Sequence, residues 1–176
     1  MLRFTIAALL FSSLTLAGQE RINPVVPSFG GIYPLEEATV RPDPRLTYKI
    51  VVDVVTGADH PGELAAGLNN VARMLNLHAV GGVPPGKMEV VVAIHGGATF
   101  ATLNDEAYRE RFGVANPNVP LVRELKDAGV KLVVCGQSLR GRGIAFETLQ
   151  PEIELGTSML TTVSTYQLRG YAVFRF

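Results

Sequence analysis

A chain of 176 residues is long enough to bury the core of one domain and short for two. Apolar residues make up 47% of it and charged residues 18%, a balance that excludes a globally disordered chain. Acidic and basic residues number 16 each and form no polybasic block, so nothing in the charge pattern indicates a nucleic-acid-binding protein.

The first residues have the layout of a secretory signal peptide. Arg3 precedes an apolar stretch, residues 4–16, and small residues surround Ala17. The stretch is shorter than the about 20 residues that a membrane-spanning helix needs. A buried N-terminal element is the alternative, but the chain that follows is polar and rich in proline. We therefore expect residues 1–17 to be removed on export, which leaves a periplasmic or secreted protein without a membrane span.

Residues 18–46 form a proline-rich arm or linker in this interpretation, because they show neither a helical nor a strand period. The prolines of this segment are Pro24, Pro27, Pro34, Pro42 and Pro44. The segment also carries apolar side chains such as Val26 and Ile32, which a fully solvated linker would not need. We expect it to lie against the domain or against a neighbouring subunit.

Predicted strands and helices alternate along the domain, residues 47–176. Apolar, β-branched runs typical of buried strands occupy residues 48–55, 88–94 and 130–134, and shorter strands are predicted at 153–155 and 171–176. Helices are predicted at 61–80, 104–112, 121–128, 144–149 and 159–168. This alternation predicts an α/β fold: a flavodoxin-like, doubly wound, mainly parallel five-stranded sheet with helices on both faces.

The ligand crevice of such a sheet lies outside the carboxyl ends of its strands. That rule selects His60 after the first predicted strand, His95 after the second, and Cys135 at the end of the third. Cys135 is the only cysteine, so a disulfide within the chain is excluded. Three interpretations of Cys135 stay open: a reactive thiol, a thiol bridged to another chain, or a buried and inert side chain.

A reactive Cys135 requires an open, electropositive notch at the rim of the sheet, because the thiolate is the nucleophile. Residues 138–143 are predicted as a glycine-rich turn or helix start whose amides would face the sulfur, and Arg140 and Arg142 would add positive charge. The side chains of His60, His95 and Cys135 are of the kinds that bind zinc or copper. Their spacing matches no compact metal motif, so we predict no metal site and no cofactor.

The stretch ELKDAGVKLVVCGQSLRGRGI, residues 124–144, resembles the DsrE/DsrF-like (YchN-like) family. The resemblance lies in a helix, a glycine, a strand that ends in a cysteine, and then an arginine–glycine pair, here Arg142 and Gly143. It extends across residues 48–176, including VVAIHGG and the closing GYAVFRF. It implies a flavodoxin-like fold, assembly into dimers, trimers or hexamers, and for some members sulfur relay through a persulfide on the cysteine at the place of Cys135.

The resemblance implies a sulfur carrier or sulfurtransferase that works with a sulfur donor or acceptor protein. The relay proteins of the family work in the cytoplasm, so the export predicted from residues 1–17 is a departure from the family. Cys135 would hold the sulfur and His95 would exchange protons. The expected substrate-binding residues are Arg140, Arg142, Gln137 and Ser138. Some relatives carry a second cysteine where Ser138 stands, so an internal dithiol–disulfide cycle is excluded here. The alternatives are a non-catalytic oligomeric scaffold and a module that binds a metal or small ligand.

Overall fold

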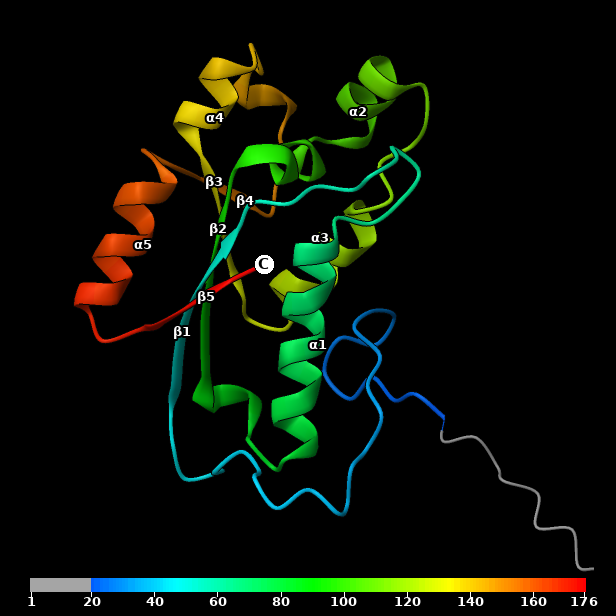
Figure 1. The fold of residues 1–176 in the computed structure, drawn as a ribbon. Helices are drawn as coiled ribbons and strands as arrows, with labels where there is room; N and C mark the ends of the chain where they lie inside the picture. The colour runs from blue at the N-terminus through cyan, green and yellow to red at the C-terminus, as the bar shows by residue number, and fades with distance from the viewer. Residues whose placement is uncertain (1–19) are drawn as a thin grey trace, which may run out of the picture.

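Five parallel strands form one sheet in the order β4-β3-β2-β1-β5 (Figure 1). The computed structural model describes residues 20–176, so the predicted signal peptide lies outside the described residues. The strands are β1 (Tyr48–Val54), β2 (Met88–Ile94), β3 (Lys131–Cys135), β4 (Ile153–Gly156) and β5 (Ala172–Arg175). The predicted α/β fold with a parallel five-stranded sheet is confirmed.

Helices cover the two faces of the sheet unequally (Figure 1). The helices α1 (Ala66–Val80) and α3 (Val119–Asp127) pack on one face, where Val52 and Val92 belong to the main core. The helix α5 (Met159–Leu168) packs on the other, where Val51, Val91 and Val133 form a small separate cluster. Side chains alternate between faces along a strand, so these residues define an α1/α3 face and an α5 face.

Shorter helices lie beyond the carboxyl ends of the strands (Figure 1). They are α2 (Asp105–Phe112), α4 (Gly136–Gly141) and the 3-10 turns η2 (Gly96–Thr102) and η3 (Phe146–Thr148), while η1 (Pro85–Lys87) precedes β2. Among residues 20–176, no helix combines the length and the apolar character that crossing a membrane requires.

Two predicted helices are wrong in extent. The helix predicted from Pro61 begins at Ala66, because tertiary hydrogen bonds hold the preceding residues as a loop. The Tyr108 hydroxyl donates to the Pro61 carbonyl at 2.9 Å, and the Ala65 amide donates to Asn118 Oδ1 at 2.8 Å. The helix predicted at 144–149 is only the single 3-10 turn η3.

The proline-rich arm lies against its own domain. Val26 and Ile32 are buried, and the fully buried carboxamide of Asn76 in α1 binds the arm's backbone. Its Oδ1 accepts hydrogen bonds from the amides of Val25 and Val26 at 2.9 and 3.0 Å, and its Nδ2 donates to the carbonyls of Phe29 and Gly30 at 2.9 and 3.1 Å. One side chain thus satisfies four backbone groups that a helix or sheet would otherwise pair.

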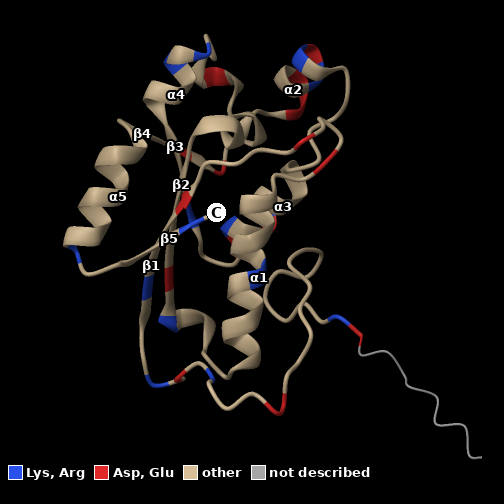
Figure 2. Cartoon of the chain, in the orientation of Figure 1, with Lys and Arg blue, Asp and Glu red and all other residues tan. Residues whose placement is uncertain are grey.

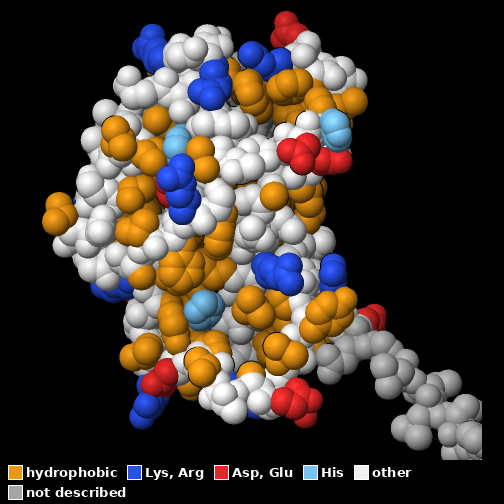
Figure 3. All heavy atoms as spheres, viewed as in Figure 1, with side chains coloured by type: hydrophobic (Ala, Val, Ile, Leu, Met, Phe, Trp, Pro, Cys, Tyr) orange, Lys and Arg blue, Asp and Glu red, His pale blue; other side chains and the backbone are white. Residues whose placement is uncertain are grey.

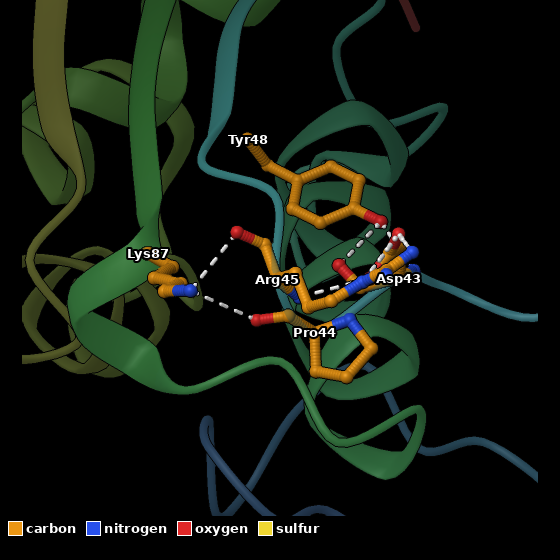
Figure 4. A network of polar contacts seen from close by, with 5 residues as sticks. All are labelled: Asp43, Pro44, Arg45, Tyr48 and Lys87. Carbon is orange, nitrogen blue, oxygen red and sulfur yellow. Dashed lines mark hydrogen bonds and ion pairs between the residues drawn. The ribbon is translucent and has the colours of Figure 1, made fainter.

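A second set of polar contacts fixes the end of the arm below the amino end of β1 (Figure 4). The Lys87 ammonium donates to the carbonyls of Pro44 and Arg45 at 3.1 and 3.0 Å. The Tyr48 hydroxyl accepts from the Asp43 amide at 2.8 Å, and the Asp43 carboxylate pairs with the Arg45 guanidinium at 2.8 Å. The chain therefore enters the first strand from a fixed direction.

Replacing Asn76 with alanine is expected to lower the free energy of unfolding by about 2–4 kcal/mol, because each buried backbone group left unpaired costs about 1–3 kcal/mol and water re-pairs some of them. Urea unfolding measures the change. Asn70→Ala, at a half-buried position on the same helix, is the matched control and should change stability by less than about 0.5 kcal/mol. Equal losses in both variants would show that Asn76 does not hold the arm.

Candidate functional site

Four polar side chains lie in a row across the α5 face, at the carboxyl ends of four neighbouring strands. They are Arg175 of β5, Asp53 of β1, His95 directly after β2, and Cys135 at the end of β3. The register pairs Asp53 with Arg175, and it pairs Ile94 with Val134, so that His95 and Cys135 follow at adjacent positions. The extended backbone at His95 continues the alternation of β2.

Cys135 is buried in the folded chain, with 5% of its surface exposed. The end of β4 and the segment after it cover the thiol: Gly156 of β4 is the register partner of Cys135, and the thiol lies 4.0 Å from the hydroxyl of Ser158, the N-cap residue of α5. A Cβ on Gly136 would lie 2.9 Å from the Gly156 carbonyl, so a glycine after the cysteine permits this close approach. The expectation of an open notch is therefore wrong for the single chain, because the β4–α5 connection crosses over the end of β3.

The surroundings of the sulfur nevertheless favour its anion. Burial raises the pKa of the Cys135 thiol, but hydrogen bonds from the amides of Met159, Ser138 and Gln137 and from the Ser138 hydroxyl together outweigh it, so that the pKa lies below its ordinary value. These amides belong to the first turns of α4 and α5. The unpaired amides of a first helical turn stabilise a negative charge.

The arginines predicted to bind substrate contact aromatic rings. The Arg140 guanidinium lies 5.2 Å from the centroid of the Phe146 ring. The Arg142 guanidinium lies 5.7 Å from the Phe100 ring and donates to the Ser138 carbonyl at 3.3 Å. Neither arginine contributes to the lowered pKa of Cys135, which comes from amides and a hydroxyl. The amides at the predicted helix start after Cys135 therefore lower the pKa of the thiol, and the two predicted arginines do not.

His95 is hydrogen-bonded to a carboxylate that sequence reasoning missed. Its Nε2 lies 2.6 Å from Asp53 Oδ1, and Arg175 Nε lies 3.6 Å from Asp53 Oδ2. Asp53 interrupts the apolar run YKIVVDVV. A charged side chain in a strand that is buried on both faces needs a partner, so the sequence could have indicated that Asp53 takes part in a polar site.

His60 lies apart from this row. It lines a cavity of about 340 Å³ on the loop after β1, together with Asp59, Phe100 and Tyr108. Within residues 20–176, no group of three or more His, Cys, Asp or Glu side chains is placed to hold a metal ion. The grouping of His60 with His95 and Cys135, on which the metal alternative rested, is therefore absent from the described residues.

Ser138→Ala removes the hydroxyl bond to the sulfur and keeps the amides, so it should raise the pKa of Cys135. Thiolate absorbance followed against pH measures this without reagent access to the buried sulfur, and Ser164→Ala, exposed on α5, is the control. Because the folded-state pKa is the lower one, the thiolate stabilises the fold above the ordinary thiol pKa, and this stabilisation is lost as the pH falls through the folded-state value. An unchanged titration in Ser138→Ala would contradict the assignment.

Comparisons with known proteins agree with this architecture. A model of the DsrE/DsrF-like family matches residues 49–176. Among solved structures, the chain is similar to MTH1491 of Methanobacterium thermoautotrophicum, a protein of unknown function (18% identity, TM-score 0.54), and to the YchN protein of E. coli (19%, 0.53). Each alignment covers 73% of this chain and 99% of the other, and at these identities it shows a shared fold. No curated protein matches the chain. Because the family model spans most of the sequence, the chain belongs to the DsrE/DsrF-like family.

Proposed function

We propose that this protein carries sulfur as a persulfide on Cys135. The supporting observation is the set of amides from α4 and α5 that face the sulfur and lower the pKa of its thiol. A cysteine with a lowered pKa holds more thiolate at neutral pH, and the thiolate is the form that attacks sulfur. Membership of a family broadly linked to sulfur relay supports the same function.

The chemistry balances without an added oxidant or reductant. The Cys135 thiolate attacks the outer sulfur of a persulfide or polysulfide donor. A new S–S bond forms on Cys135 and the donor's S–S bond breaks; a persulfide donor leaves as a thiolate, and a polysulfide donor leaves as an anion one sulfur shorter. An acceptor thiolate then attacks the outer sulfur and releases the Cys135 thiolate. Because the chain has no second cysteine, the acceptor is a separate molecule, and a protein thiol is the partner that we propose.

The other residues of the site have distinct proposed roles. His95 takes a proton from the incoming thiol and returns one to the leaving group, since imidazole exchanges protons near neutral pH. Ser138 and Gln137 hold the negative charge of the Cys135 sulfur through their amides, both before sulfur binds and when it leaves. Arg140 and Arg142 attract an anionic donor toward the carboxyl edge of the sheet. Since Cys135 is buried, a small inorganic polysulfide reaches it more readily than a protein-bound donor does.

Mass spectrometry after exposure to inorganic polysulfide tests the sulfur-carrier proposal. The wild-type chain should gain the mass of one or more sulfur atoms, mapped to the peptide that contains Cys135, and a reducing thiol should remove them. Cys135→Ser, which keeps the size of the side chain, should gain none. No addition to the folded wild type, or equal addition to both proteins, overturns the proposal.

An oligomeric scaffold with an inert cysteine is the second candidate, favoured by the burial of Cys135 and by the surface of α5. The helix α5 has no buried residue, and it carries no charged side chain along its length (Figure 2). Hydrophobic side chains also reach the surface over α5 and β5 (Figure 3), among them Leu160 and Leu168 of α5 and Val173 of β5. An uncharged, apolar surface of this kind is typical of a protein interface, and a second copy of the chain is the occupant that the family resemblance suggests.

Association of copies is expected with either function, and Leu168→Glu tests it. Leu168 is 90% exposed on α5, so a charge there should leave the fold intact and weaken an interface built on this helix. Light scattering should give the wild type a mass that is a multiple of one chain and the variant a lower mass. Val40→Glu, at a position 92% exposed on the arm, is the control. A monomeric wild type at micromolar concentration would contradict the proposal.

We also propose that the chain is exported to the periplasm or secreted. The support is the sequence alone: a basic start, an apolar stretch and small residues around Ala17. N-terminal sequencing of the mature chain tests this, and a secreted chain that still begins at Met1 contradicts the cleavage.

A further inference from the structure

The carboxylate of Asp53 is the one group in the polar row of the α5 face that contacts two others. It lies on β1, an interior strand between β2 and β5, and its side chain is 8% exposed. His95 approaches one oxygen at 2.6 Å, and Arg175 approaches the other at 3.6 Å. A buried carboxylate is tolerated only where hydrogen bonds and opposite charges replace water. The proposed chemistry gives this residue no role, although it links His95 and Arg175 within the row.

The short contact with His95 determines where the imidazole carries its proton. An ionised carboxylate can only accept hydrogen bonds, so His95 Nε2 must donate to Asp53 Oδ1. In a neutral imidazole the other nitrogen, Nδ1, then carries the lone pair. Arg175 supplies the second oxygen of Asp53 with a cationic partner. The helix α5, packed over this face, carries no Asp, Glu, Lys or Arg that would compete for these contacts.

We propose that Asp53 is a positioning residue, which holds His95 in the tautomer protonated at Nε2 and so keeps Nδ1 as the proton acceptor of the site. The inference rests on the proposed sulfur chemistry, and it adds Asp53 of β1 to the residues Cys135 and His95 that take part in it. A buried acid that orients a histidine beside a nucleophile is an established arrangement in nucleophilic catalysis. Here the register brings the histidine and the nucleophile to adjacent positions of neighbouring strands, and the acid comes from the strand on the other side of the histidine.

Nitrogen NMR of histidine-labelled protein reads the tautomer directly. The chain has three histidines, and the spectrum of His95→Gln identifies the signals of His95. At neutral pH the wild type should show Nε2 protonated and Nδ1 unprotonated. Asp53→Asn should mix the two tautomers, because an amide side chain can donate as well as accept. Arg175→Gln is the matched control, since it removes the other partner of Asp53 and should leave the tautomer as in the wild type.

A second readout is the rate at which polysulfide loads Cys135. Asp53→Asn should lower this rate by about 100-fold, the low end of what general acid–base catalysis contributes, whereas Arg175→Gln should stay within about threefold of the wild type. Circular dichroism checks that each variant is folded. If Asp53→Asn does not fold, the tautomer of His95 in the wild-type nitrogen spectrum decides whether the proposal holds.

The possible failures are distinguishable. A wild type that is protonated at Nδ1, or that averages the two tautomers, overturns the role of Asp53. So does a folded Asp53→Asn that loads sulfur at the wild-type rate. If the wild type takes up no sulfur while its His95 is protonated at Nε2, the sulfur-carrier function fails and the orientation of His95 by Asp53 stands.

Discussion

The strands β1, β2 and β3 carry apolar, β-branched side chains on both faces, and both faces must be covered. On the α1/α3 face this is achieved in depth, because α1, α3 and the arm residue Val26 contribute to one large core. On the α5 face the cluster is small, and the helix above it buries none of its own residues completely. The polar row from Arg175 to Cys135 lies on the α5 face, beside this small cluster. The charged groups of the row are therefore at the edge of the apolar core, where they pair with one another.

The same arrangement explains how Cys135 can be both buried and acidic. Removal from water alone makes a thiolate unfavourable, but backbone amides at the start of two helices replace the lost water with fixed donors. These donors need no rearrangement when charge appears on the sulfur, whereas a guanidinium on a flexible side chain would have to be ordered. The connection that supplies one of the amides, at Met159, belongs to the same segment that covers the thiol. Restricted access and part of the stabilisation of the anion therefore have the same structural cause.

Much of this could be predicted from local patterns. The β-branched runs located the central strands, and the rule for parallel sheets brought His95 and Cys135 to the same edge. The burial of Cys135 was one of three open interpretations, and local patterns could not decide between them because the burial depends on a connection from β4 that passes over β3. The partners of Asp53 were also out of reach, since His95 and Arg175 lie 42 and 122 residues further along the chain and meet it only through strand order. Asn76 shows the same limit: its position in a helical pattern indicates nothing about the arm that it binds.

The arm differs from the domain because its described residues contain no helix or strand and are held by their contacts with α1 and β1. It joins the main core through Val26, through the adjacent side chains of Val25 and Phe29, and through the Asn76 carboxamide, and that attachment closes a loop of about 50 residues. Segments with few buried contacts open locally at a smaller free energy than global unfolding requires. Release of the arm would leave every strand pairing intact and would uncover apolar surface on α1. The arm therefore covers the better-packed side of the sheet, away from the carboxyl ends of the strands where the thiol lies.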